Sequence, residues 1–309
     1  MRRGQKDVEA PPDPASAEPE PPRRKLHRRN TLNDLTGTEW IKATKSWLIC
    51  DSHRYHKNKA TELHPARYPE ELVAEFLRFF TKRDGWVLDP FCGSGATLIA
   101  CHENARRGVG IEISERYAAV CARRAAELGA QERLFVVHAD ANRAASPELY
   151  AGVPVPLDER TALPQFDLVI TSPPYWNMLR HSRGGVESAQ KKRAKKGLDT
   201  VYSETAEDLG NITGYEDFIE GLGRVFDGCA QVMRPGAYMV VVVQNLRTPG
   251  GEVKPLAWDL QRRISQTLLF QGERIWCQNS KPLGIWGYPT VFVPNYHHHY
   301  CLIFRKATG

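Results

Sequence analysis

A short segment following a strand-like run combines side chains and backbone groups that can hold an amine. It consists of Ser172, Pro173, Pro174 and Tyr175, directly after the apolar residues 166–171. The Ser172 hydroxyl and the carbonyl groups of Ser172 or Pro173 can accept the two hydrogens of an amino group. Prolines have no amide hydrogen and fix the backbone, so these carbonyls stay free. The Tyr175 ring offers a stacking surface for a nucleic-acid base, worth roughly 1–3 kcal/mol. The alternative interpretation is a plain turn, because proline pairs after strands are common.

Three other strand-like runs end in residues that suit a nucleoside. Residues 86–89 lead into a loop in which Gly93 and Gly95 allow a sharp turn and a close approach to a ligand. Glu112 ends the second run, where an acid can hold two ribose hydroxyls. Asp140 follows the third run and can accept from an adenine amino group. Either acid alone could simply cap a helix, but the three features in order, each at a strand end, favour a nucleoside site.

Two common phosphate-binding patterns are missing from this glycine loop. A dinucleotide site usually has the fuller pattern GxGxxG, and residues 93–98 lack its third glycine. The kinase-type pattern GxxxxGK[ST] is absent as well. The absence of both patterns disfavours a dinucleotide, or a nucleotide bound as in kinases, as the ligand.

The elements that must position these residues alternate along the chain. We predict strands at 86–89, 108–112, 134–138, 166–171, 238–243, 273–278 and 299–305, and helices at 96–103, 114–127, 215–233 and 255–270. Ser114 caps the start of the helix predicted over residues 114–127. Pro235 and Gly236 are expected to end the helix predicted over residues 215–233. Such alternation predicts an α/β fold, a mostly parallel sheet with helices on both faces.

The domain organisation follows from composition. Residues 1–30 are rich in proline, acidic and basic residues, which predicts a disordered basic tail, and residues 31–309 form a single domain. Residues 177–214 interrupt the alternation as a long insert, and inserts of this length are usually functional or mobile. Its basic run is either a solvated charge cluster or a contact for phosphates.

Charge and cysteine usage narrow the class of protein. The net charge of +6 is compatible with a polyanionic partner without establishing one. No apolar run is long enough to cross a membrane, and the first residues do not resemble a secretory signal. Seven scattered cysteines without a CxxC pair predict reduced thiols in a cytoplasmic protein and no zinc site. We expect no metal at His297–His299 either, because neighbouring strand residues point to opposite faces.

Two of these segments resemble a known family. Residues 89–97, DPFCGSGAT, closely resemble the DPFxGSGTT segment of amino-directed DNA methyltransferases, with Ala96 where many members have threonine. Residues 64–70, HPARYPE, are similar to the HPxxxPxxL segment that precedes it in that family. The resemblance implies a Rossmann-like, seven-stranded sheet whose last strand is antiparallel, and S-adenosylmethionine as the cofactor.

The resemblance also implies a set of cofactor-binding residues. The glycine loop would surround the methionine part, Glu112 would bind the ribose, Asp140 the adenine, and residues 64–68 would close the pocket. The full expected set is His64, Pro65, Ala66, Arg67, Tyr68, Asp89, Pro90, Phe91, Cys92, Gly93, Ser94, Gly95, Glu112, Ile113, Asp140, Ala141 and Ser172.

Ser172, Pro173, Pro174 and Tyr175 resemble the (D/N/S)PPY catalytic tetrad of the same family. The resemblance implies methylation of an exocyclic amine on a flipped base of double-stranded DNA, with the serine favouring N4 of cytosine over N6 of adenine. Carbon-5 methylation is disfavoured because no cysteine follows the prolines. The alternatives are an adenine-N6 enzyme, an RNA base methyltransferase and a non-catalytic DNA-binding relative. A partner restriction endonuclease is compatible with this family.

Candidate DNA contacts lie in the insert and near the chain end. The basic residues expected to meet phosphates are Arg180, Arg183, Lys191, Lys192, Arg193, Lys195 and Lys196. The loop from Lys281 to Asn295 carries Trp286 and Tyr288 and could shape the pocket for the base. In this chain the cofactor loop precedes the tetrad, whereas many enzymes with an SPPY tetrad have the reverse order.

Overall fold

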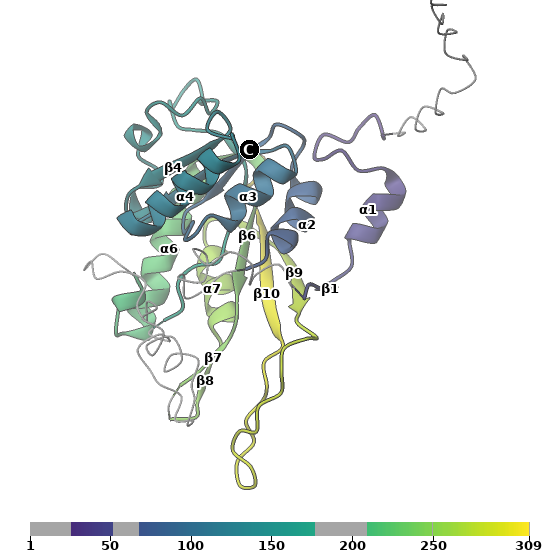
Figure 1. Ribbon diagram of the computed structural model, residues 1–309, viewed down its shortest axis with the longest axis vertical. Coiled ribbons are helices and arrows are strands. Elements are labelled where there is room, and N and C mark those ends of the chain that lie inside the picture. Colours follow the sequence, from purple (N-terminus) through teal and green to yellow (C-terminus); the bar gives the residue numbers. More distant parts are fainter. Residues whose placement is uncertain (1–25, 52–67, 177–208, 249, 309) are drawn as a thin grey trace, which may run out of the picture.

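The computed structural model describes residues 26–51, 68–176, 209–248 and 250–308. Within them one sheet of eight strands forms the centre of the molecule, in the order β1-β9-β10-β6-β5-β2-β3-β4 (Figure 1). β10 is antiparallel to β6 and β9, and the other neighbouring strands are parallel. The bounds are β1 (Trp47–Ile49), β2 (Trp86–Asp89), β3 (Arg107–Glu112), β4 (Leu134–His138), β5 (Phe166–Thr171), β6 (Met233–Val243), β9 (Leu269–Cys277) and β10 (His298–Arg305). Two short strands, β7 (Leu246–Arg247) and β8 (Val253–Lys254), pair separately.

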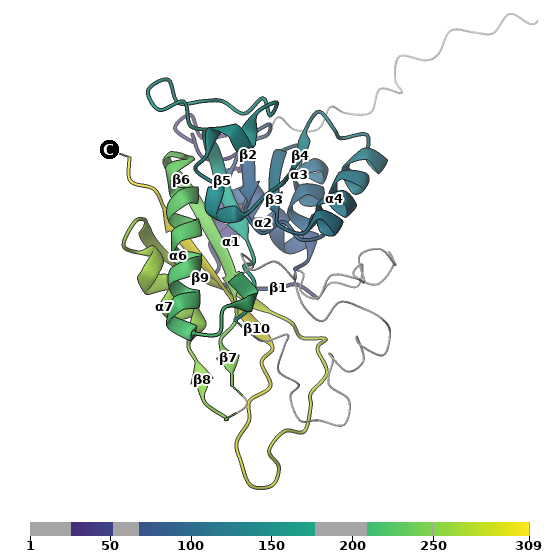
Figure 2. The ribbon, with the colours of Figure 1, turned by 90° about the vertical axis from the view of Figure 1, so that its left-hand side faces the viewer.

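Helices cover both faces of the sheet, which lies between α6 and α7 on one side and α2, α3 and α4 on the other (Figure 2). Their bounds are α1 (Gly37–Ala43), α2 (Glu70–Phe80), α3 (Ala96–Glu103), α4 (Glu115–Glu127), α6 (Tyr215–Gln231) and α7 (Leu256–Ile264). The 3-10 helices are η4 (Ala141–Arg143), η5 (Pro147–Tyr150) and η6 (Leu209–Asn211). Two apolar clusters, one for each face, make up the core. None of the described helices is long and apolar enough to cross a membrane.

Burial explains why the central strands read as apolar runs. All four residues of β2 and five of the six in β5 are buried, because helices cover both faces of a parallel sheet. α2 instead buries one stripe, including Leu72, Phe76 and Phe80, at the spacing of an amphipathic helix. The predicted α/β fold, the mostly parallel sheet and the antiparallel last strand are confirmed.

The number of strands differs from the expected seven. β1 is an eighth strand and lies outermost in the sheet. It pairs parallel with β9, from Trp47 opposite Ile275 to Ile49 opposite Cys277. With three residues, mostly exposed, it has too little burial to produce a recognisable sequence pattern. Its backbone partner on β9 stabilises it instead.

Two predicted helix ends were wrong. The helix expected over 255–270 ends at Ile264, and Leu269 and Phe270 begin β9, where they pair with Arg305 and Phe304 of β10. Apolar residues continue past Ile264 to the buried Leu268, so apolar periodicity alone does not mark the end of the helix. The long helix expected to reach residue 233 ends at Gln231, and its supposed stop, residues 235–236, lies inside β6.

Different segments of the chain lie at the two ends of the parallel strands. We call the edge where β2 to β6 end the carboxyl edge, and the opposite one the amino edge. β9 runs parallel to β6, since both are antiparallel to β10, so the segment joining β9 to β10, residues 278–297, also lies at the carboxyl edge. The described carboxyl terminus follows β10 at the amino edge (Figure 1).

Candidate functional site

The glycine loop and the Ser-Pro-Pro-Tyr tetrad meet at the switch point of the sheet. β2 and β5 are neighbours, but the chain continues from β2 toward β3 on one side and from β5 toward β6 on the other. In open α/β sheets ligands bind at the carboxyl ends of the strands at such a point. The Thr171 hydroxyl donates to Asp89 Oδ1 over 2.6 Å, which joins the last residue of β5 to the last residue of β2.

Asp89 is the buried centre of this junction. Besides Thr171, it accepts from the Tyr68 hydroxyl at 3.0 Å, from the Thr97 hydroxyl and from the backbone amide of Phe91 at 3.0 Å. Burial raises the pKa of its carboxyl, and the hydroxyl and amide donors oppose that rise. With four neutral donors, Asp89 holds β2, β5, α3 and residue 68 together.

The glycine loop fits its surroundings closely. Gly95 has a φ of 85°, and a Cβ there would lie 2.9 Å from the Cys121 sulfur of α4. In β3, a Cβ on Gly110 would come within 2.3 Å of the Cys92 sulfur, so this strand leaves room for the loop. Ser94 is buried, and its hydroxyl oxygen has no hydrogen-bond partner in the described residues. Buried polar groups normally have a partner, so a partner for the Ser94 hydroxyl is expected outside the described residues.

The two predicted acids lie on neighbouring strands at the same edge. Glu112 is 9% exposed, and its carboxylate accepts from the backbone amides of Gly93 at 2.7 Å and Ser114 at 2.9 Å. Asp140 is half-buried and accepts from the Asn142 amide at 2.9 Å, capping η4. The Asn142 side-chain amide also donates to both Asp140 oxygens, at 3.1 and 3.2 Å.

In the tetrad, the serine is more accessible than the tyrosine. Ser172 and Pro174 are half-buried, whereas Pro173 and Tyr175 are buried. Burial raises the pKa of Tyr175 to about 12, and a hydrogen bond with the Ser172 side chain opposes the rise. The Tyr175 ring, 7% exposed, presents little surface on which a base could stack in this conformation. Its clearest role in the described structure is to position Ser172.

Trp176 follows the tetrad and is fixed by its own contacts. Its indole Nε1 donates to the Thr213 carbonyl at 3.2 Å, and its ring meets that of Tyr215 edge to face at 5.1 Å. These contacts join the tetrad to the start of α6. The indole is half-exposed, so it offers more aromatic surface than Tyr175 does.

The remaining predicted cofactor residues follow the same strand ends. Pro90, Phe91 and Cys92 belong to the loop after β2, Ile113 follows β3, and Ala141 begins η4. Tyr68 is buried against Asp89. The structure therefore brings the residues expected from 68 to 175 together at one edge.

Several predictions lie outside the described residues. They are the cofactor residues His64, Pro65, Ala66 and Arg67 and the DNA contacts Arg180, Arg183, Lys191, Lys192, Arg193, Lys195 and Lys196. Most of the predicted tail and most of the insert, residues 1–25 and 177–208, lie outside as well. Residues 26–30 are described, and the Asn30 side chain donates to Asn33 at 2.8 Å.

Sequence reasoning gave no role to two hydroxyls of this site. Thr97 and Thr171 both donate to Asp89, one from the first turn of α3 and one from the end of β5. Their positions beside the glycine loop and the tetrad are the only sequence signal that could have identified these two threonines as site residues. The partner of each is far away in the sequence or on another element, so it could not be identified before folding.

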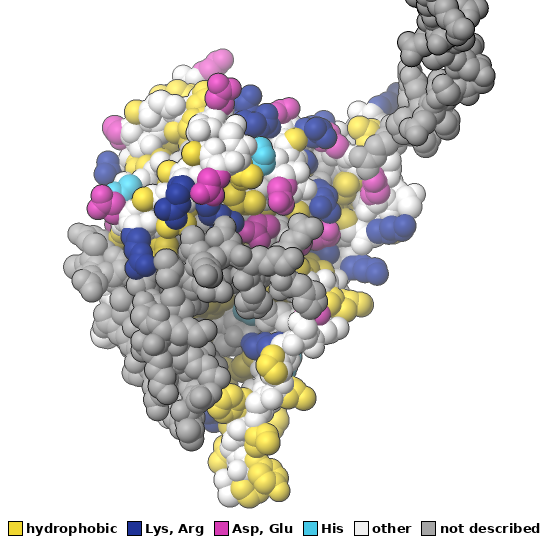
Figure 3. All heavy atoms as spheres, in the orientation of Figure 1, with side chains coloured by type: hydrophobic (Ala, Val, Ile, Leu, Met, Phe, Trp, Pro, Cys, Tyr) yellow, Lys and Arg dark blue, Asp and Glu magenta, His cyan; other side chains and the backbone are white. Residues whose placement is uncertain are grey.

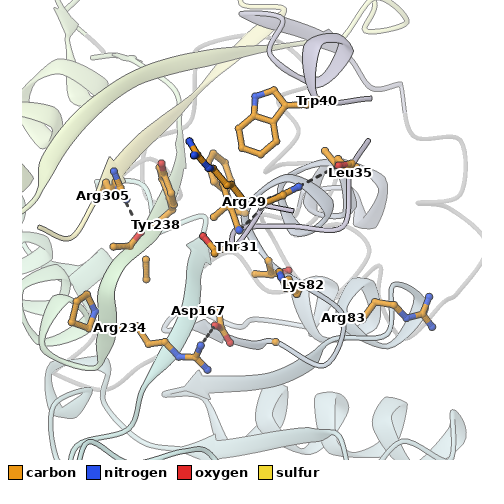
Figure 4. Close-up of a pocket in the computed structure, with 18 of the residues that line it drawn as sticks. Arg29, Thr31, Leu35, Trp40, Lys82, Arg83, Asp167, Arg234, Tyr238 and Arg305 are labelled. Carbon is orange, nitrogen blue, oxygen red and sulfur yellow. Dashed lines mark hydrogen bonds and ion pairs between the residues drawn. The ribbon is translucent and has the colours of Figure 1, made fainter. Parts of the chain in front are cut away.

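A cavity of about 920 Å³ lies at the amino edge, away from this site. Its basic lining residues are Arg29, Lys82, Arg83, Arg234 and Arg305, together with the aromatic Trp40 and Tyr238. In Figure 4 the Arg234 side chain reaches Asp167, with which it forms an ion pair at 2.7 Å. None of the strand-end residues described above lines this cavity, so we assign it no part in the same chemistry.

Comparisons with known proteins match parts of the chain. Residues 11–123 match the family described as DNA methylase, and residues 84–213 match the family described as RNA cap guanine-N2 methyltransferase. The first match contains the glycine loop and Glu112, and the second contains the tetrad. Each covers less than half of the chain.

Curated relatives resemble shorter stretches. The Type II methyltransferase M.ScaI of Streptomyces caespitosus is 41% identical over 54 residues, 18% of this chain and 18% of its own length. M.MthZI of Methanothermobacter thermautotrophicus is 32% identical over 95 residues, 30% of this chain and 26% of its own. The chain thus spans less than a third of either relative. The solved structure of TrmN from Thermus thermophilus overlaps with a TM-score of 0.44 at 12% identity, covering 77% of this chain and 48% of that one.

Proposed function

We propose that this chain transfers a methyl group from S-adenosylmethionine to an exocyclic amino group of a base in double-stranded DNA. The observation that carries the proposal is the hydrogen bond from Thr171 to Asp89, because it joins the ends of the two strands from which the glycine loop and the tetrad depart. The match of residues 11–123 to the DNA methylase family supports DNA as the substrate.

The donor and acceptor set at the carboxyl edge fits this cofactor. Ser94 has a buried hydroxyl without a described partner, suited to a polar group of the ligand. Glu112 suits the ribose hydroxyls, and Asp140 suits an adenine amino group, since carboxylates accept from such donors and both acids follow strand ends at the carboxyl edge. S-adenosylmethionine supplies an electrophilic methyl group when bound. Residues 64–67 and Tyr68 complete the pocket in this proposal.

The tetrad holds the amine. Ser172 accepts one amino hydrogen through its hydroxyl, and the backbone carbonyl of Ser172 or Pro173 accepts the other. The nitrogen lone pair is then directed at the methyl group, and fixed orientation of this kind supplies most of the rate. The buried Tyr175 holds the Ser172 hydroxyl through their hydrogen bond. The target base must leave the duplex stack to reach this site, at a cost of a few kcal/mol.

Cytosine N4 is the favoured position, with adenine N6 as the alternative. A serine in the first position of the tetrad tilts the choice toward cytosine but correlates with it imperfectly. Digestion of methylated DNA to nucleosides followed by mass spectrometry distinguishes N4-methylcytosine from N6-methyladenine. A product that contains only N6-methyladenine would overturn the cytosine assignment while leaving amino methylation in place.

One observation favours a second candidate, methylation of an amino group in RNA. Residues 84–213, which include the tetrad, match the RNA cap guanine-N2 methyltransferase family. Guanine N2 is also an exocyclic amine, so the same arrangement of Ser172 and the backbone carbonyls suits it. The amine chemistry is common to both candidates, and only the nucleic acid differs.

The decisive experiment offers both nucleic acids to the purified chain. Labelled S-adenosylmethionine is incubated with duplex DNA and, separately, with total RNA, and incorporation is measured. We expect label in DNA. Label in RNA with none in DNA would establish the second candidate. Modification-sensitive sequencing of DNA from cells that express the chain would then report the base and its sequence context.

Location and partners follow from this activity. A DNA-modifying enzyme of this type acts in the cytoplasm, in contact with the nucleoid, and a cognate restriction endonuclease is a candidate partner. The basic residues between 180 and 196 remain our candidates for phosphate contacts. Reversing their charges as a group should weaken DNA binding at all sequences and reduce its salt dependence.

A further inference from the structure

The segment between β9 and β10, residues 278–297, projects from the carboxyl edge as a long hairpin, which we call the edge hairpin (Figures 1 and 2). Its tip exposes large apolar side chains, and Figure 3 shows them on the projection. They are Leu283 (79% exposed), Ile285 (87%), Trp286 (46%), Tyr288 (82%), Val291 (56%) and Phe292 (87%). Contiguous exposed apolar surface of this kind usually marks an interaction site.

Hydrogen bonds organise the edge hairpin before any partner arrives. Asn295 bridges its two arms, because its Oδ1 accepts from the Gly284 amide and its Nδ2 donates to the Gly284 carbonyl, both at 2.9 Å. The Trp286 indole also donates to Asn295 Oδ1, at 3.2 Å. Gly287 has a φ of 69°, and a Cβ there would lie 2.2 Å from the Val291 carbonyl, so only glycine fits this turn. A preorganised segment loses less entropy on binding.

The base of the edge hairpin is hydrogen-bonded to residues that follow β1 and β6. Ser280 donates to the Asp51 side chain at 3.0 Å, just beyond β1. Gln244, directly after β6, donates to the His298 carbonyl at 2.7 Å. β6 is the neighbour of β5, which leads into the tetrad. The edge hairpin therefore projects from the same side of the sheet as Ser172.

Its charge suits a polyanion. The sequence contains no aspartate or glutamate from residue 274 to residue 309, and Lys281 is the only lysine or arginine in the edge hairpin. A phosphate backbone alongside would meet no carboxylate from this segment. Proteins that kink duplex DNA insert apolar side chains such as phenylalanine and isoleucine between base steps.

We propose that the tip of the edge hairpin, with Ile285 and Phe292 at its most exposed points, acts as a wedge that enters the base stack of duplex DNA beside the target base. The proposal rests on the function proposed above. The wedge offsets part of the energy of unstacking by burying apolar side chains against bases.

The experiment compares duplex with single-stranded DNA of the same sequence, because a single strand has no duplex to open. The test variant is Ile285→Ser with Phe292→Ser. The matched control is Ile41→Ser with Leu157→Ser, two exposed apolar residues away from the carboxyl edge. Initial rates of methyl transfer are measured on both substrates, and thermal unfolding midpoints show whether each variant is folded.

We expect the test variant to lose about tenfold in rate on duplex DNA, which corresponds to about 1.4 kcal/mol of lost stacking. Its rate on single strands should stay within about twofold of the unmodified chain, and the control should match the unmodified chain on both substrates. Equal losses on both substrates would overturn the wedge and leave the proposed function standing. An unmodified chain that methylates neither DNA overturns both.

A second copy of this chain is the rival occupant of the apolar tip. Analytical ultracentrifugation of the unmodified chain and the test variant separates the two. If the unmodified chain is a dimer that Ile285→Ser with Phe292→Ser converts to a monomer, the tip is a dimer contact and the wedge proposal is wrong. The same oligomeric state in both proteins, together with the selective loss on duplex DNA, supports the wedge.

Discussion

Asp89 at the carboxyl edge is held differently from two aspartates at the amino edge. At the amino edge, Asp84 and Asp167 pair with Arg133 and Arg234, each at 2.7 Å. At the carboxyl edge, Asp89 accepts from three hydroxyls and an amide, and within the described residues it forms no ion pair. An arginine compensates the charge of its partner, whereas neutral donors orient a carboxylate and leave its charge in place. Neutral donors therefore orient Asp89, whereas arginines compensate the charges of Asp84 and Asp167.

The largest expected effect is on catalysis at the carboxyl edge. Ser172→Ala removes the hydroxyl that accepts an amino hydrogen, and misplacement of the amine should lower kcat by about 100-fold, or about 2.7 kcal/mol. Isothermal titration calorimetry should show a much smaller loss in the affinity for S-adenosylmethionine than the loss in kcat, because Ser172 is only one of the residues expected in the cofactor pocket. Ser146→Ala, a serine whose side chain makes no capping bond, is the matched control. A parallel loss of cofactor affinity would instead assign Ser172 mainly to the cofactor pocket.

The next effect concerns the junction itself. Thr171→Val keeps the shape of the side chain but removes one donor from the buried Asp89 carboxylate. Hydrogen bonds to charged groups contribute about 2 kcal/mol, so the free energy of unfolding should fall by about that amount, and methyl transfer should fall with it. Urea denaturation measures the first and the labelling assay the second. Thr171→Ser, which retains the hydroxyl, should recover most of both, and equal damage in the two variants would contradict the role of the hydroxyl.

The free energy of unfolding should fall at acid pH because of His299, which lies at the carboxyl edge. Burial lowers the pKa of His299 to about 3, with smaller contributions from Lys281 and His298. The unfolded chain takes up this proton below about pH 6.5 while the folded chain does not, so stability is lost as pH falls. By pH 5.5 the loss should be about 1.4 kcal/mol.

The variant that checks this is His299→Phe, which keeps a ring against Trp276, whose centroid lies 4.5 Å away. Unfolding is measured by urea at pH 7.5 and pH 5.5. The difference between the two pH values should be smaller in the variant by about 1.4 kcal/mol. Identical differences in both proteins would show that His299 does not carry this dependence.

The smallest effect is expected at the amino edge. Arg234→Gln breaks the ion pair with Asp167, but the arginine side chain is 46% exposed. Exposed pairs contribute about 0–1 kcal/mol, and Asp167 still accepts from the Trp86 amide at 2.7 Å. Methyl transfer should be unchanged. A loss of activity comparable to that of Ser172→Ala would show that the ion pair of Asp167 at the amino edge also matters for methyl transfer, and would contradict the comparison.

The sequence predicted elements best where burial is complete. β2 and β5 appear with the expected bounds, because both faces of a covered parallel sheet demand apolar residues. β1 was missed, and the helix ending at Ile264 was extended too far. In both places the conformation depends on a backbone partner distant in the sequence, on β9 or β10, which no local pattern encodes.

For the site, the sequence alone determined which residue types stand at the strand ends: the glycine loop, Glu112, Asp140 and the tetrad. These are local features, since a turn needs its own glycines and a tetrad its own prolines. Only the tertiary structure decided that Asp89 faces inward and that Tyr175 is buried behind Ser172. It also decided that the edge hairpin projects beside them. Strand order fixes these relations, and strand order is set by the packing of the whole sheet.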